Sequence, residues 1–192
     1  EGEHTNFADV AGWKKKCRGV KFQDVDADLA DLRIIKTPEE LEKLKMAEHI
    51  GDLAFEEIIK YLKPGVTELE IAARLEFTLK MKGGEGISFD PIVASGVNSS
   101  KPHAIPSSKK IEKGDFVTLD FGCIYRGYCS DMTRTVVVGK ANAKQKKVYN
   151  KVLEAQLAVM KSLKPGLTGI EIDKIARDII DESEFKGTFG HG

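Results

Sequence analysis

The sequence lacks any long apolar run, and no stretch approaches the ~20 apolar residues that a membrane-spanning helix needs. It also lacks an excess of charge, since 30 basic and 30 acidic side chains give a formal net charge of +0. No global field therefore favours nucleic acid or an acidic membrane surface. Cysteine is scarce, and the three residues Cys17, Cys123 and Cys129 form neither a metal-binding pair nor an even disulfide framework. We expect free thiols and a cytoplasmic, reducing location.

What is present is typical of a folded domain, because 41% of the 192 residues are hydrophobic and 31% are charged. Residues 1–33 are predicted to form a helix over Phe7–Lys16, a strand over residues 20–25 and a linker over residues 27–33. About thirty residues cannot bury a core of their own. We interpret residues 1–33 as the C-terminal remnant of an upstream domain plus a linker, and residues 34–192 as the main domain.

A sequence pattern occurs twice, at residues 62–71 and again at residues 163–172. Each copy follows an amphipathic helix and opens a new helix with a Thr-x-x-Glu capping box, Thr67 with Glu70 and Thr168 with Glu171. One interpretation is two unrelated helix–turn–helix corners. The other is a duplicated unit whose two halves pack their strands into one helix-covered sheet, with a site at the seam.

Two aspartates lie in the β-rich segment between these copies. Residues 116–122 and 129–138 are predicted strands of apolar and β-branched residues, yet they contain Asp120 and Asp131, and aspartate is disfavoured in strands. A tight loop centred between residues 125 and 126 would set the two aspartates directly opposite each other on one face. Their Cβ atoms would then be ~5 Å apart.

Two explanations of this acidic pair remain open from spacing alone. Like charges so close must share a proton or bind cations. Hard oxygen ligands suit manganese or similar divalent ions, and imidazole ligands widen the choice to cobalt, iron or zinc. Alternatively, the hairpin is exposed and each aspartate forms an ion pair with a basic residue such as Arg134 or Arg126.

Two histidines have a context that suggests chemistry. His103 lies in a loop bounded by Pro102 and Pro106, where an imidazole could hydrogen-bond a substrate or a reacting oxygen, although histidines on surface loops are common. His191 lies between two glycines, which allow backbone or ligand to come close.

Together these residues resemble the metallopeptidases of the pita-bread fold, which include methionine aminopeptidases and Xaa-Pro aminopeptidases and dipeptidases. The resemblance covers about residues 30–192. It is carried by residues 92–103, 113–122 and 127–135, and the last run is closer to the Xaa-Pro peptidases. It implies an α+β pita-bread fold with an internal pseudo-two-fold repeat. It also implies C-terminal truncation, so that residues 34–192 would be an incomplete catalytic domain.

The resemblance assigns roles to matching positions. Asp120 and Asp131 would be metal ligands, and His103 would contact substrate. Residues 188–192 match a run that precedes the ligand histidine in Xaa-Pro peptidases, so His191 would bind substrate and stabilise the intermediate. In methionine aminopeptidases a similar Gly-His-Gly run holds the ligand itself. The ligand histidine, a further catalytic histidine and two glutamates would lie beyond Gly192.

The resemblance therefore implies a metallo-exopeptidase. Two divalent ions, manganese or cobalt with zinc or iron as alternatives, would generate a bridging hydroxide that attacks the carbonyl before a proline at the second position. The 192-residue piece would be inactive by itself, and the full-length protein would be a homodimer. The alternatives are a methionine aminopeptidase and a non-catalytic pita-bread protein that binds other proteins.

Overall fold

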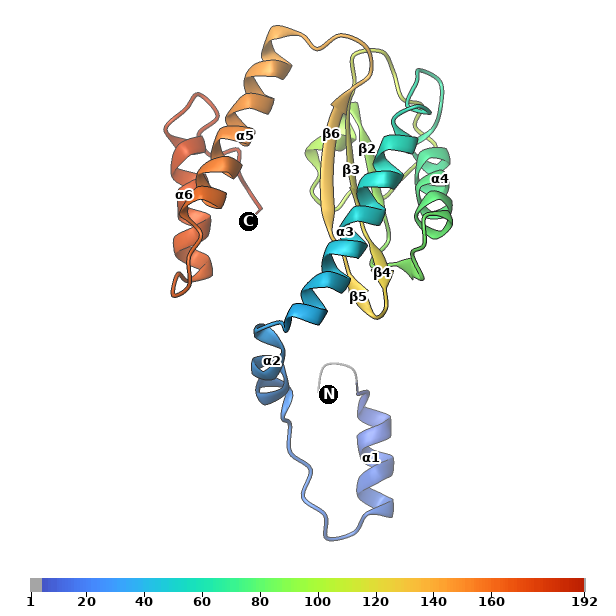
Figure 1. Cartoon of the computed structure of the whole chain (residues 1–192), viewed down its shortest axis with the longest axis vertical. Helices are drawn as coiled ribbons and strands as arrows, with labels where there is room; N and C mark the ends of the chain where they lie inside the picture. The colour runs from blue at the N-terminus through green and yellow to red at the C-terminus, as the bar shows by residue number, and fades with distance from the viewer. Residues whose placement is uncertain (1–4, 192) are drawn as a thin grey trace. The chain divides into compact units, whose positions relative to one another are not determined.

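The computed structural model describes residues 5–191, which fall into two compact units, residues 1–45 and residues 46–192. Figure 1 traces the chain from its blue N-terminal helices to its orange and red C-terminal helices. The first unit holds α1 (Phe7–Lys16), α2 (Asp26–Ile34) and the start of α3 (Pro38–Ile58). No residue of α1 or α2 is buried, as expected of a segment too short for its own core.

The N-terminal expectations are partly wrong. The helix over Phe7–Lys16 is confirmed, and the Asn6 side chain caps it by accepting a 3.0 Å hydrogen bond from the Asp9 backbone N–H. The predicted strand over residues 20–25 is irregular chain, because nothing within this small unit offers it a partner strand. The predicted linker is the helix α2, whose first turn begins with Asp26, a residue type that the helix dipole favours there.

Helix α3 begins at a reciprocal cap. The Glu40 backbone N–H donates to Thr37 Oγ1 at 3.3 Å, and the Thr37 N–H donates to Glu40 Oε2 at 2.7 Å. The buried residues of this helix recur at helical spacing and form one face. They are Ala47, Ile50, Gly51, Ala54 and Ile58.

The second unit is built on two small antiparallel sheets. One has the strand order β2 (Ile92–Ser95), β3 (Phe116–Phe121), β6 (Met132–Val137), and the other has the order β1 (Gly86–Ile87), β4 (Cys123–Tyr125), β5 (Tyr128–Cys129). Helices α3 and α4 (Glu68–Met81) lie beside these sheets in Figure 1.

Strand β3 alternates between two environments. Val117, Leu119 and Phe121 are fully buried in the core that the sheet shares with α3 and α4. Residues of the other parity, among them Thr118 and Asp120, are only partly buried. Because strand side chains alternate between faces, the face of the sheet away from this core carries Asp120.

Both copies of the repeat form helix–turn–helix corners. The second copy joins α5 (Ala143–Ser162) to α6 (Gly169–Asp181), which pack against each other. Both predicted capping boxes are confirmed, and the turn glycines Gly65 and Gly166 have nearly equal φ values of +95° and +94°. No helix in residues 5–191 is long and apolar enough to cross a membrane.

Candidate functional site

The hairpin that carries the two aspartates has a different register from the predicted one. Arg126 and Gly127 form its two-residue turn, both at positive φ (+48° and +78°), as type I′ turns require. Asp120 therefore pairs with Thr133, and Asp131 lies between β5 and β6, directly before the first residue of β6. The predicted strand over residues 129–138 is interrupted at residues 130–131, and the prediction that the aspartates lie directly opposite each other is wrong.

The two carboxylates nevertheless influence each other. Burial raises the pKa of Asp120, and the negative charge of Asp131 raises it further. A hydrogen bond from the Thr133 hydroxyl and the nearby His103 oppose this rise, but the pKa stays above its ordinary value. The side chains around Asp120 therefore do not offset the negative charge of its carboxylate.

One oxygen of Asp120 is left without a partner. Among the described residues, Asp120 Oδ1 is a buried side-chain oxygen that accepts no hydrogen bond. Such an atom loses its water on folding and gains nothing in return, which costs about 1–3 kcal/mol. A buried, unpaired carboxylate oxygen beside a second carboxylate is a donor set that fits a hard divalent cation.

The interpretation of the aspartates as ion-paired surface residues is wrong. Arg134 Nη2 lies 3.0 Å from Asp52 Oδ1, and the guanidinium of Arg126 lies over the ring of Tyr125. Within residues 5–191 neither Asp120 nor Asp131 forms an ion pair with a basic side chain. A further acidic side chain contacts the same segment, because Glu48 Oε1 accepts a 3.3 Å hydrogen bond from the Asp131 backbone N–H.

The two predicted histidines are in contact. The Nε2 atoms of His103 and His191 lie 2.9 Å apart, and the rings meet edge to face with centroids 4.8 Å apart. A hydrogen bond between them requires one Nε2 to carry a proton and the other to accept it. Both side chains are exposed, so they remain accessible to a ligand. Since His103 also acts on the pKa of Asp120, the four predicted residues gather in one region.

Arg177 holds the segment that carries His191, a role that sequence reasoning missed. Its Nη1 donates to the Phe189 carbonyl oxygen at 2.6 Å, and its guanidinium stacks over the Phe189 ring. The Asp173 carboxylate orients the same guanidinium through two hydrogen bonds of 2.8 and 2.9 Å. The i, i+4 spacing of Asp173 and Arg177 on a helix was the available signal.

A cavity of about 540 Å³ opens on the same sheet face as Asp120. The sheet lines it with Thr118, Thr133 and Thr135, and α5 contributes Tyr149 and Val152. A volume in this range suits a small ligand. Neither aspartate lines the cavity, but Thr133, the partner of Asp120 across the sheet, does, so the cavity provides space for a small molecule on this face of the sheet.

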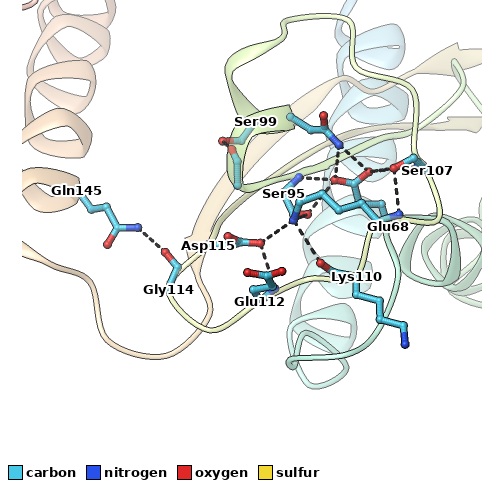
Figure 2. A network of polar contacts seen from close by, with 12 residues as sticks. Glu68, Ser95, Ser99, Ser107, Lys110, Glu112, Gly114, Asp115 and Gln145 are labelled. Atoms are coloured by element: carbon cyan, nitrogen blue, oxygen red, sulfur yellow. Dashed lines mark hydrogen bonds and ion pairs between the residues drawn. The ribbon is translucent and has the colours of Figure 1, made fainter.

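Glu68, the first residue of α4, is the second group that sequence reasoning missed. Its side chain is fully buried, and Figure 2 shows its carboxylate between Ser95 and Ser107. It accepts hydrogen bonds from the backbone and hydroxyl groups of both serines and from the Asn98 amide. Lys109 extends this network by donating to Ser95 Oγ and to Asp115 Oδ2, each at 2.9 Å.

These donors keep Glu68 ionised and make stability depend on pH. Burial alone raises the pKa of Glu68, but hydrogen bonds from Ser107, Ser95 and Asn98 outweigh it, so the pKa lies below its ordinary value. The stabilisation is therefore complete above the ordinary glutamate pKa of 4.5 and is lost as the pH falls through the lower folded-state pKa. We expect Glu68→Gln to unfold at a lower denaturant concentration than the wild type at pH 7. This difference in the unfolding midpoint should become smaller below about pH 4. A difference of constant size down to pH 3 would contradict this.

The chain is similar to known proteins along its whole length. The model of metallopeptidase family M24 matches residues 42–192. A Xaa-Pro dipeptidase from Pyrococcus furiosus is 44% identical over 191 residues, covering 97% of the chain and 55% of that protein. The structure of a Xaa-Pro dipeptidase from Bacillus anthracis matches with a TM-score of 0.94 at 45% identity, over 100% of this chain and 54% of that one.

A third relative is an aminopeptidase. The structure of an X-Pro aminopeptidase from Thermotoga maritima matches with a TM-score of 0.90 at 39% identity, over 97% of this chain and 53% of that one. The chain thus spans about half the length of the relatives it matches. The α+β pita-bread fold expected from the sequence is confirmed by these likenesses. With a family model over residues 42–192 and relatives along the whole chain, the chain belongs to metallopeptidase family M24.

Proposed function

We propose that the full-length protein containing this chain uses divalent metal ions to hydrolyse the peptide bond between an N-terminal residue and proline. The observation that carries the proposal is the buried, unpartnered Oδ1 of Asp120 beside the carboxylate of Asp131. Relatives titled Xaa-Pro dipeptidase and X-Pro aminopeptidase support the choice of substrate. In this proposal residues 1–33 end an upstream domain and residues 34–192 begin the catalytic one.

Asp120 and Asp131 would hold the metal ions, and their hard oxygen donors suit manganese or a similar divalent ion, while imidazole ligands would widen the choice to cobalt, zinc or iron. Two divalent ions, when bound, supply a nucleophile from water at neutral pH and stabilise negative charge on the substrate carbonyl oxygen. Residues 5–191 contain no group of three or more His, Cys, Asp and Glu side chains that could hold a metal. We therefore place the remaining ligands in other parts of the full-length protein.

His103 and His191 would handle the substrate. Their 2.9 Å contact fixes the tautomer of each ring relative to the other, because only one Nε2 can donate to its partner. A substrate oxygen that enters between them would accept the hydrogen bond that one imidazole N–H now donates to the other ring. Such a donor, held in place before the reaction, stabilises charge that develops in the transition state.

The test is hydrolysis by the full-length protein after metal removal and resupply with Mn²⁺ or Co²⁺. We expect cleavage of Xaa-Pro dipeptides or of longer Xaa-Pro peptides to return only with metal. Cleavage of Met-Xaa peptides alone would identify a methionine aminopeptidase instead. No cleavage with any divalent metal would leave a non-catalytic binding protein. Light scattering on the same sample tests the proposed homodimer.

A further inference from the structure

We propose that Glu68 is a positioning residue for His103, acting by clamping both ends of the loop that carries it. The catalytic part of this inference rests on the function proposed above. The structural part, that one buried carboxylate sets the conformation of residues 96–107, rests on contacts within the chain alone.

The two oxygens of the carboxylate contact both ends of the loop, and the Asn98 amide donates to both of them, at 3.1 and 3.3 Å (Figure 2). Oε1 holds the start, accepting from the Ser95 backbone N–H at 2.7 Å, from Ser95 Oγ at 2.8 Å and from Asn98 Nδ2 at 3.1 Å. Oε2 holds the end, accepting from the Ser107 N–H at 3.2 Å and from Ser107 Oγ at 2.7 Å. A single rigid group thereby fixes the distance between the points where the loop leaves and rejoins the fold.

The first turn of α4 supports the same end of the loop. The backbone N–H groups of Glu68 and Leu69 donate to the carbonyl oxygens of Lys109 and Ser107, both at 3.1 Å. Among the described residues, none of residues 102–106 takes part in a backbone–backbone hydrogen bond. The main chain through His103 is therefore held by its two ends, by the buried Ala104 and by the contact of His103 with His191.

The repeat separates this role from helix formation. In the second copy the position of Glu68 is occupied by Gly169, whereas the capping glutamate Glu70 recurs as Glu171. The α6 corner forms the same capping box without a carboxylate at this position. Burial of a carboxylate is costly unless it is fully hydrogen-bonded, and its partners in the first copy all belong to the loop region. Glu68 is therefore explained by the loop and not by the helix.

The experiment compares Glu68→Gln with Glu70→Gln in the full-length protein. The amide introduced by Glu68→Gln would turn an N–H₂ group toward donors that now all point at an acceptor. Glu70 lies two residues away, is exposed, and bonds only within the cap, which glutamine also completes. Hydrogen exchange by mass spectrometry, bound metal content, kcat and KM would be measured for both variants.

We expect Glu68→Gln to speed exchange in residues 96–107 at least about tenfold relative to β3, with wild-type metal content. We also expect kcat on Xaa-Pro peptides to fall by about 10–100-fold, the range for partners that orient a functional group. Glu70→Gln should change none of these. Ser107→Ala, which removes one donor and keeps the carboxylate, should loosen the end of the loop if Glu68→Gln fails to fold.

Exchange that rises equally in the loop and in β3, or not at all, would overturn the inference and leave Glu68 with a general structural role. Loss of bound metal in Glu68→Gln would overturn it as well, because the loss of activity would then come from a damaged metal site at Asp120 and Asp131 and not from a displaced His103. If the wild-type protein cleaves no Xaa-Pro peptide, the proposed function fails, but the exchange data still decide whether Glu68 sets the His103 loop.

Discussion

Asp131→Asn in the full-length protein is expected to abolish metal-dependent cleavage before proline, with kcat/KM falling by more than about 100-fold. Residues that only support a metal ligand cost about 10–100-fold, and removal of a ligand exceeds that. Asparagine keeps the shape of the side chain and removes its charge, so the fold should persist. The measurement is initial-rate kinetics at saturating Mn²⁺ or Co²⁺, together with metal content.

Asp178→Asn provides the matched control, since this aspartate lies on α6 and forms an exposed ion pair with Lys174. It should cleave at the wild-type rate, because such pairs contribute little. Wild-type turnover by Asp131→Asn would contradict the assignment of Asp131 as a ligand. Equal losses in both variants would point to a general sensitivity to lost charge.

Gly122→Ala is expected to reduce the free energy of unfolding by about 3 kcal/mol, the upper end for steric overpacking. A Cβ atom at Gly122 would lie 1.8 Å from the Ser130 carbonyl oxygen and 2.4 Å from Ser88 Oγ. The first of these is a backbone atom of the segment between β5 and β6, so the main chain itself must move. Ser130 directly precedes Asp131, and the displacement should reduce activity together with stability.

Denaturant unfolding of the full-length protein measures this change, with Gly86→Ala as the comparison. Gly86 also lies in the second unit, in strand β1, but a Cβ there would meet no atom within 4 Å. The free energy of unfolding should change by less than about 0.5 kcal/mol in this variant. Equal effects of the two substitutions would show that the backbone contact at Ser130 relaxes without cost.

Features with local signals could be predicted from the sequence. The helix over Phe7–Lys16 and the capping boxes at Thr67 and Thr168 depend on residues within one turn of each other, and all are confirmed. The choice of His103, Asp120 and Asp131 came from unusual residues in recognisable segments, and their roles stay predictions. The strand predicted over residues 20–25 was wrong because a strand needs a partner that propensity alone does not supply.

Features that depend on backbone geometry or on distant contacts could not be predicted in the same way. The hairpin register was missed because Arg126 adopts a positive φ, which is uncommon for a residue with a side chain. The role of Glu68 was missed because Ser95, Asn98 and Ser107 lie far along the chain, and no helical or strand period links them to it. Only the folded structure brings these donors together.

The difference between Glu68 and Gly169 also suggests how the two halves diverged. A capping pair contains both partners within four residues, so any copy of the segment inherits a working pair. Glu68 has its partners in another segment, whereas the matching Gly169 is exposed, with no atom within 4 Å of an added Cβ, so the second copy offers no donors to a carboxylate there. The capping box recurs in both copies and the buried carboxylate does not, so the contact with the His103 loop belongs to the first copy alone.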